Sequence, residues 1–411
     1  MASPVNPPRG MRDFLPAEKR RREHALAVIR RVYRGHGFDE IETPALEDVE
    51  RLHAGIGGDN EKLAYSVLKR GLGGDDLRAA AESGDPLALA DLGLRYDLTV
   101  PLARYYATNR AELPPVFRAL QIGPVWRAER PQKGRYRQFV QCDIDVLGEA
   151  GPIAELELIA ATTEALAELG LTGTSVRIND RRILNRLLET WGLAGENAAR
   201  ALITIDKLDK IGVPGVVDEL GTQGVDTAGL HEAFATLAAA GWDLLVDPPA
   251  WLEQDAYRDL LALRDALPDV DLVFDPTLVR GMGYYTGTIF EIEHPGFGSS
   301  LGGGGRYDGM IGRFLGQAVP AVGFSIGFER ILDLLPPSDD GSGALVLLHD
   351  DDVPAPVLLA AKAAARDEHG RVRLERTRRN RRAQLDALAA EGFTAVATVT
   401  AEGTGETRPL R

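Results

Sequence analysis

Cysteine is almost absent from this sequence, since Cys142 is the only one among 411 residues. A single thiol cannot form a disulfide or a cysteine metal site within one chain, so neither is expected here. Long apolar runs are missing too, because no stretch approaches the roughly 20 residues of a membrane-spanning helix. The opening Met1 to Arg12 contains no apolar segment typical of a secretory signal. We therefore expect a cytoplasmic protein that does not enter a membrane.

Positive charge is also in short supply. Lys and Arg number 47 against 61 Asp and Glu, and the net charge of −14 argues against a surface that binds nucleic acid everywhere. Two segments depart from this average, because Arg127 to Arg137 is strongly cationic and Arg371 to Arg382 is rich in arginine. For each, a solvated face and a local phosphate-binding site are both open explanations.

The sequence does contain enough apolar material for a large core. Hydrophobic residues make up 44% and charged residues 26%, which is typical of a soluble globular protein. A chain of this length exceeds the size at which one core keeps growing, so we expect two or three domains. Helical segments separated by Gly and Pro, and a linker-like composition later in the chain, suggest the boundaries. We predict a core formed by 1–181 and 268–335, a helical insertion at 182–267, a linker at 336–343 and a small α/β domain at 344–411.

A β-hairpin is the first segment that suggests chemistry. Two expected strands, 116–127 and 138–147, enclose a cationic loop rich in Pro and Gly. Arginines on such a hairpin can bind phosphate oxygens in a bidentate manner, and Phe139 can stack on a base. An arginine-rich hairpin is also often a solvated edge. Here Glu129 and Asp145 alternate with the cations, as a site for a zwitterionic substrate requires.

A second candidate segment runs from Arg280 to the paired tyrosines Tyr284 and Tyr285. Because successive strand side chains point to opposite faces, both tyrosines cannot be core residues, and we expect one to line a cavity. The glycine run 302–305 predicts a place where the backbone comes close to another group. It lacks the features of a dinucleotide fingerprint and of a Walker loop. A final helix is expected at about 319–335.

In this order, the segments resemble the motifs of the class II aminoacyl-tRNA synthetases, and in detail those of the histidine-specific family. Arg9–Pro16 is similar to that family's N-terminal signature, Gly37–Pro44 to motif 1, the hairpin to motif 2, Gly323–Arg330 to motif 3, and the segments around Arg280 and Gly303 to two histidine signatures. The resemblance covers nearly the whole chain. It implies an α+β fold, in which an antiparallel sheet flanked by helices carries the helical insertion and the small C-terminal α/β domain. It also implies a homodimer formed through motif 1.

The resemblance implies a role for each matching residue. For ATP, Arg127 holds the α-phosphate, Glu129 faces the adenine, Phe139 stacks on it and Arg330 binds the γ-phosphate. For L-histidine, Asp97, Thr99 and Gln141 bind the α-ammonium group, Arg127 the carboxylate, and Asp145, Tyr285 and the neighbouring Tyr284 surround the imidazole. Arg280 lies against the α-phosphate, where a fixed cation stabilises the transition state. Arg127 and Arg280 are thus the catalytic candidates. Mg²⁺ accompanies the phosphates and is held partly by the nucleotide.

The implied activity is histidine–tRNA ligation, with ATP, L-histidine and tRNA(His) as substrates. Two departures from the family pattern qualify it: Gly283 stands where an Asp is common, and the segment from Leu345 to Arg411 is shorter than the usual anticodon-binding domain. The short domain leaves open an enzyme that delivers its acyl-adenylate to an acceptor other than tRNA. A third reading is a paralogue, the histidine-sensing regulatory subunit of ATP phosphoribosyltransferase, which typically lacks the C-terminal domain and a full catalytic set.

Overall fold

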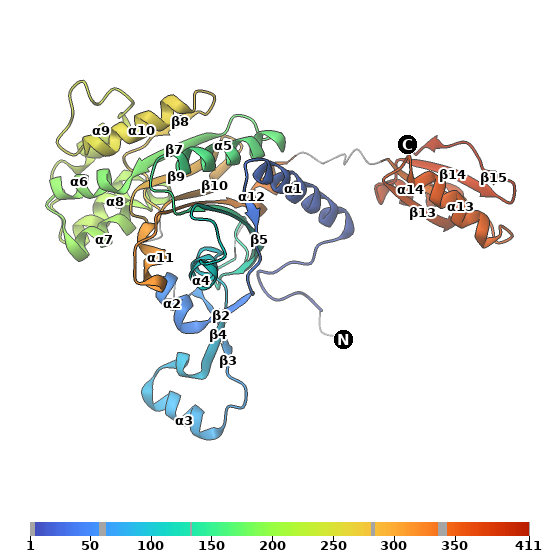
Figure 1. Ribbon diagram of the computed structural model, residues 1–411, viewed down its shortest axis with the longest axis horizontal. Coiled ribbons are helices and arrows are strands. Elements are labelled where there is room, and N and C mark those ends of the chain that lie inside the picture. Colours follow the sequence, from blue (N-terminus) through green and yellow to red (C-terminus); the bar gives the residue numbers. More distant parts are fainter. Residues whose placement is uncertain (1–4, 57–62, 132–133, 281–283, 336–342, 411) are drawn as a thin grey trace. The chain divides into compact units, whose positions relative to one another are not determined.

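The computed structural model describes residues 5–56, 63–131, 134–280, 284–335 and 343–410 (Figure 1). The chain divides into two compact units, Met1–Asp13 with Leu26–Leu335, and Phe14–Ala25 with Pro336–Arg411. Helix α1 (Pro16–Gly35) crosses this division. In the described part of the chain, no helix is long and apolar enough to span a membrane.

An eight-stranded sheet forms the centre of the first unit, in the order β1-β5-β6-β11-β10-β9-β7-β8. Its strands are β1 (Asp39–Glu40), β5 (Phe117–Trp126), β6 (Gln138–Leu147), β7 (Ser175–Asp180), β8 (Leu272–Phe274), β9 (Thr288–His294), β10 (Phe297–Arg306) and β11 (Ala321–Gly327). All pairings between β5 and β7 are antiparallel, while the edge strands β1 and β8 pair in parallel. The predicted antiparallel sheet is confirmed. The predicted hairpin is formed by β5 and β6.

Helices cover both faces of this sheet (Figure 1). On one face, α5 (Ile153–Glu168) packs against β6 and β11. On the other, α4 (Thr99–Asn109) and α11 (Asp308–Leu315) pack together, and Phe117 and Ala321 from the sheet share their apolar cluster. The fold class predicted from the sequence, a sheet flanked by helices, is therefore correct.

The expected helix at 319–335 is wrong in its first half. Ala321–Gly327 is the strand β11, and α12 (Phe328–Leu334) begins only after it. β11 lies between β6 and β10 and is buried on both faces, so its sequence lacks the alternation that distinguishes a strand from a helix. The glycine run likewise lies within strand β10.

Two further groups of elements belong to the first unit. A small sheet, β2-β4-β3, contains β2 (Leu46–Asp48), β3 (Tyr65–Leu68) and β4 (Ala90–Leu94), with α2 (Val49–Ile56), α3 (Gly74–Ser83) and the 3-10 helix η2 (Pro86–Leu89) beside it in sequence. Five helices follow β7: α6 (Arg181–Thr190), α7 (Gly195–Ile205), α8 (Leu208–Thr222), α9 (Leu230–Ala238) and α10 (Gln254–Ala266). Side chains from α6 to α9 share an apolar cluster with Leu278 and Val279, so these helices support the chain just before Arg280. Region 182–267 is largely helical, and its status as a separate domain stays a prediction.

The second unit contains a small α/β fold. Its elements are β12 (Ala344–His349), α13 (Ala355–Arg366), β13 (Arg371–Arg376), α14 (Arg381–Ala390), β14 (Ala395–Thr400), β15 (Gly403–Thr404) and β16 (Arg408–Pro409). β12 pairs in parallel with β13 and β14, and the helices form the connections that parallel strands require. The predicted linker lies outside the described residues except for Gly343.

Candidate active site

A single cavity of about 880 Å³ in the first unit collects every site residue predicted from the sequence. Its lining includes Asp97, Thr99, Arg127, Glu129, Phe139, Gln141, Asp145, Arg280, Tyr284, Tyr285 and Arg330. The volume falls in the range of roughly 300–1,000 Å³ that is common for ligand pockets. Gly283, the noted departure from the family pattern, lies outside the described residues.

Strand register builds one wall of the cavity. From β5 to β7, one row across the sheet consists of Gln121, Asp143, Ser325, Gly303, Glu291 and Arg177. The adjacent row on the same face includes Asp145, Gly323 and Gly305. Side chains in register across a sheet point to one face. These two rows therefore direct three acids (Asp143, Asp145 and Glu291) and one cation (Arg177) toward the same face, and their three glycines place no side chain there.

Glycines give the cavity its depth. A Cβ atom on Gly323 would lie 2.0 Å from Asp145 Oδ1, and one on Gly303 would lie 2.6 Å from Arg280 Nη1. On the opposite face, a Cβ on Gly304 would lie 1.9 Å from the carbonyl oxygen of Gly323. The close backbone approach predicted from the glycine run is therefore present, and the neighbouring strand β11 is one of the groups approached.

The acidic side of the cavity holds three buried aspartates, Asp97, Asp143 and Asp145. Burial raises the pKa of each, and raises the pKa of Asp145 to about 7 although a hydrogen bond opposes the shift. Asp97 Oδ1 accepts from the backbone N–H of Val100 at the start of α4. Among the described residues, Asp97 Oδ2 and Gln141 Oε1 are buried without a hydrogen-bond donor. Because such acceptors are costly, they mark a place for a donor group of a ligand.

Three tyrosines surround Asp145. The Tyr307 hydroxyl donates to Asp145 Oδ1 at 2.5 Å. The Tyr284 ring lies 4.9 Å from that of Tyr285 and 6.0 Å from that of Tyr307, centroid to centroid. Both paired tyrosines line the cavity, which agrees with the expectation that they are not both simply core residues, and Tyr284 also belongs to the neighbouring apolar cluster. They precede β9, which begins at Thr288, so strand alternation does not apply to them.

The cationic side holds three arginines whose N–H donors are only partly used within the protein. Arg127 donates to the Tyr96 carbonyl and lies over the Tyr96 and Phe139 rings, with no carboxylate partner among the described residues. Arg330 donates to the Ser300 carbonyl at 2.5 Å and likewise lacks an acidic partner there. Burial, together with the charges of Arg135 and Arg280, lowers the pKa of Arg330.

The third of these is Arg280, which pairs with one acid. Its Nη1 donates to Glu291 Oε2 at 2.6 Å, while its buried Nε has no acceptor in the described part of the chain. Burial opposes the charge of Arg280, but Glu291, Tyr285 and Asp206 together more than compensate, so the net effect raises its pKa and it stays cationic.

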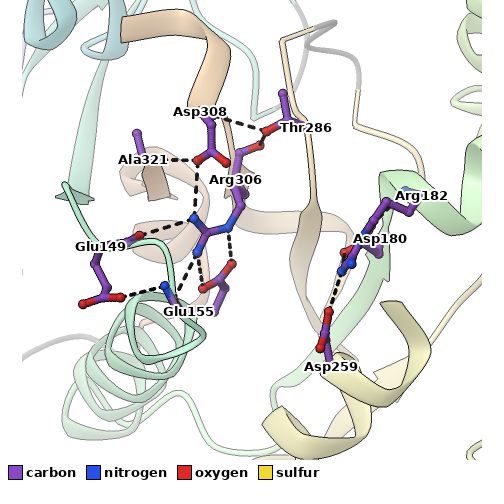
Figure 2. A network of polar contacts seen from close by, with 10 residues as sticks. Glu149, Glu155, Asp180, Arg182, Asp259, Thr286, Arg306, Asp308 and Ala321 are labelled. Atoms are coloured by element: carbon purple, nitrogen blue, oxygen red, sulfur yellow. Dashed lines mark hydrogen bonds and ion pairs between the residues drawn. The ribbon is translucent and has the colours of Figure 1, made fainter. Parts of the chain in front are cut away.

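Other arginines nearby are fully occupied. Arg306 donates to both oxygens of Glu155, to Asp308 and to the carbonyls of Glu149 and Gly151, as Figure 2 shows for most of this network. Arg177 pairs with Asp209, Asp275 and Glu293. An arginine whose N–H donors are already hydrogen-bonded within its own chain stabilises the fold and has few donors available for a phosphate. This separates Arg127, Arg280 and Arg330 from their neighbours.

The N-terminal signature and motif 3 meet beside the cavity. Arg12 pairs with the buried Glu329 at 2.5 Å, and the backbone N–H of Val140 donates to the other Glu329 oxygen at 3.3 Å. Glu129 pairs with Arg135 at 3.4 Å on the hairpin. These ion pairs hold the segments on which Phe139 and Arg330 are placed.

Sequence reasoning missed several polar lining residues, among them Asp143, Glu291, Tyr307 and Ser325. Two of them could have been found, because Asp143 precedes Asp145 by one strand period and Tyr307 follows the glycine run.

Within the described ranges, no group of three or more His, Cys, Asp or Glu side chains could hold a metal ion.

Comparison with known proteins decides the family. The sequence model of the histidyl-tRNA synthetases matches residues 10–331. This chain belongs to the histidyl-tRNA synthetase family. It is 61% identical to the histidine–tRNA ligase of Leifsonia xyli subsp. xyli over 98% of this chain and 97% of that protein. It is 40% identical to the Aeropyrum pernix histidine–tRNA ligase over 80% of this chain and 73% of that one.

Solved structures agree with this family assignment. The crystal structure of histidyl-tRNA synthetase from Nostoc sp. PCC 7120 matches with a TM-score of 0.78 and 26% identity, covering 98% of this chain and 93% of that one. A Bacillus halodurans structure described as an ATP phosphoribosyltransferase regulatory subunit/histidyl-tRNA synthetase matches with a TM-score of 0.77 over 97% and 99% of the two chains. At 22% identity, this second match shows a shared fold alone.

Proposed function

We propose that this chain is a histidine–tRNA ligase, which uses ATP to activate L-histidine and transfers it to the 3′ end of tRNA(His). One observation carries the proposal: a single cavity has unpaired acceptor oxygens on one side and arginines with available N–H donors on the other. A zwitterionic amino acid placed beside a polyphosphate requires that combination.

Histidine fits the acidic side. Its α-ammonium group would donate to Asp97 Oδ2 and Gln141 Oε1, near Thr99, which removes the cost of leaving those oxygens unpaired. The imidazole would reach Asp145, whose carboxyl Tyr307 already orients from one side. Tyr284 and Tyr285 would pack around the ring. A carboxylate partner fixes which imidazole nitrogen carries the proton, and this supports selection of histidine over amino acids with neutral side chains.

The chemical step needs no protein nucleophile. An oxygen of the histidine carboxylate attacks the α-phosphorus of ATP, the bond to the bridging oxygen of the β-phosphate breaks, and diphosphate leaves. Arg127 and Arg280 would bind the α-phosphate oxygens, where charge accumulates in the transition state. A hydroxyl of the terminal tRNA ribose then attacks the carbonyl carbon of the adenylate, and AMP leaves.

The rest of ATP fits the hairpin and motif 3. Arg330 would bind the γ-phosphate, because it lines the cavity and has no carboxylate partner among the described residues. Phe139 would stack on the adenine, with Glu129 on the adenine side. Mg²⁺ would enter as part of the MgATP substrate, whose phosphate oxygens supply most of its ligands.

Two partners complete the proposal. The second unit would bind tRNA through exposed arginines. Residues 182–267 would act as a distinct helical domain next to the catalytic core. A homodimer would form through the motif 1 segment. Its strand β1 is an edge strand, and Arg95, beside Asp97 in sequence, donates to the carbonyl of Thr43 at 2.8 Å. That bond links the proposed interface to the histidine pocket.

Amino-acid-dependent ATP–pyrophosphate exchange, followed by charging of tRNA, tests the proposal. We expect exchange with histidine and with no other proteinogenic amino acid, and esterification of tRNA(His). Exchange without charging would point instead to a non-tRNA acceptor. Histidine binding without exchange would point to a regulatory protein, and either result would refute the ligase.

A further inference from the structure

Arg280 has to be held in place by something other than its own backbone. It follows β8 in residues 275–280, which form neither a helix nor a strand. A long arginine side chain loses about 2 kcal/mol of rotamer entropy when it is fixed in one orientation. A catalytic cation that must meet a phosphate without reorganising therefore needs an anchor on a rigid element.

Glu291 is such an anchor. It lies on β9, which pairs with β7 on one side and β10 on the other, so its backbone is fixed from both sides. Its Oε2 accepts from Arg280 Nη1 at 2.6 Å, and the side chains of Glu291 and Arg280 are 15% and 23% exposed. A partly buried, charge-assisted bond of this length restricts the guanidinium strongly.

Register supplies the second half of the anchor. Gly303 lies directly opposite Glu291 in the β9–β10 pairing. A Cβ atom there would lie 2.6 Å from Arg280 Nη1 and 2.7 Å from Cζ. The guanidinium thus rests on the bare backbone of one strand while an acid on the next strand holds its edge.

The ion pair with Glu291 uses only some of the N–H donors of Arg280. Arg177, in the same row across the sheet, has three acidic partners, whereas among the described residues Arg280 has one ion-pair partner and an Nε without an acceptor. Asp206, at the end of α7, adds negative charge near Arg280 and also lines the cavity. The ion pair with Glu291 orients Arg280 without occupying all of its donors.

We propose that Glu291, with Gly303 in register beside it, is the positioning residue that holds the Arg280 guanidinium ready for the α-phosphate. This inference rests on the proposed function, because it concerns the adenylation step. Glu291 does not touch the reacting atoms in this role. It acts through Arg280.

Glu291→Gln tests this, because it keeps the shape of the side chain and removes the charge. We expect kcat for histidine-dependent pyrophosphate exchange to fall about tenfold or more, with the histidine Kd within about threefold of wild type. Glu157→Gln is the matched control: Glu157 pairs with Arg118 at 2.7 Å outside the cavity, and its loss should leave exchange unchanged.

A double-mutant cycle separates positioning from general damage. In an Arg280→Ala background, Glu291→Gln should cause no further loss, because the side chain that it positions is gone. Additive losses, a parallel loss of histidine binding, or an unchanged kcat would each overturn the inference. Wild-type protein that shows no histidine-dependent exchange would refute the proposed function itself, so the two failures are distinguishable.

Discussion

At the residue scale, the informative quantity is how many donors or acceptors of a side chain are already satisfied. The sequence contains many arginines near its motifs, and their number does not show which of them bind substrate. Arg306 and Arg177 spend their donors within the fold, while Arg127 and Arg330 have no acidic partner among the described residues. Only the folded arrangement of acids makes this distinction, and for this reason sequence reasoning could place Arg280 at the site but could not find Glu291.

Arg280→Ala should slow adenylate formation by about 10²–10³-fold while histidine affinity changes far less. The reason is that a cation aimed at the α-phosphate acts mainly on the chemical step. Pyrophosphate exchange gives the rate and calorimetry gives the affinity. Arg118→Ala, which removes an ion pair outside the cavity, is the control. A rate within about threefold of wild type would show that Arg280 is not the catalytic cation.

Asp145 makes the stability of the unliganded protein depend on pH. Its folded pKa is about 7, above the roughly 3.9 of an unfolded Asp, so the folded state binds the extra proton between these values. The resulting stabilisation is present at low pH and is lost as pH rises through about 7. Asp145→Asn removes this loss, at roughly 1.4 kcal/mol for each pKa unit. It should therefore be more stable than wild type at about pH 8, with a smaller gap at about pH 5.

Thermal unfolding of the ligand-free proteins at the two pH values measures this gap. The exposed Asp265→Asn is the matched control and should show no such gap. Asp145→Asn should also lose histidine binding. Asp145 would then serve the recognition of histidine although it lowers the stability of the folded protein. A gap of equal size at both pH values would rule out the titration of Asp145 as its cause.

At the element scale, strands bounded by turn residues were predictable, whereas β11, which runs into helix α12 without a turn, was not. The β5–β6 hairpin follows the predicted strands closely, because the Pro- and Gly-rich loop separates two runs of strand-forming residues. The sequence predicts a helix over β11, since Ala321 to Gly327 is continuously apolar or small. The register that brings Asp143, Gly303 and Glu291 into one row is a long-range property, and no local pattern encodes it.

Gly304→Ala should destabilise the protein strongly. Its Cβ would lie 1.9 Å from the Gly323 carbonyl oxygen, and two paired central strands would have to separate. Overpacking of this kind costs about 1–3 kcal/mol or more. Gly309→Ala is the contrast, because it lies in helix α11 with open space around its Cβ position and should be neutral or stabilising by up to about 1 kcal/mol. Equal melting temperatures for the two variants would contradict the tight β10–β11 pairing.

At the scale of the whole molecule, charge is distributed unevenly between the two units. The net charge of −14 belongs to a chain whose second unit exposes Arg376, Arg378, Arg379, Arg381 and Arg382. None of these arginines lines the cavity. For Arg371 to Arg382 the sequence left a solvated face and a phosphate-binding site both open, and the structure divides this segment between strand β13 and the first residues of helix α14.

Replacing these five exposed arginines with Gln should separate activation from transfer. Histidine-dependent pyrophosphate exchange should be unchanged, because the cavity lies in the other unit. Charging of tRNA(His) should weaken, and the dependence of tRNA binding on salt should flatten, because each lost phosphate contact reduces counterion release. Charging that matches wild type at every salt concentration would mean that the second unit does not bind tRNA through this surface.

The four consecutive glycines of β10 also constrain how this gene can change. At each of Gly302, Gly303, Gly304 and Gly305, an added Cβ would lie 2.7 Å or less from a backbone carbonyl oxygen of a neighbouring strand. Every missense change in a glycine codon adds a Cβ, so no conservative replacement is available at any of the four positions. In a saturation-mutagenesis library selected for growth, these codons should tolerate synonymous changes and nothing else, whereas the nearby codon of Gly309 should accept alanine.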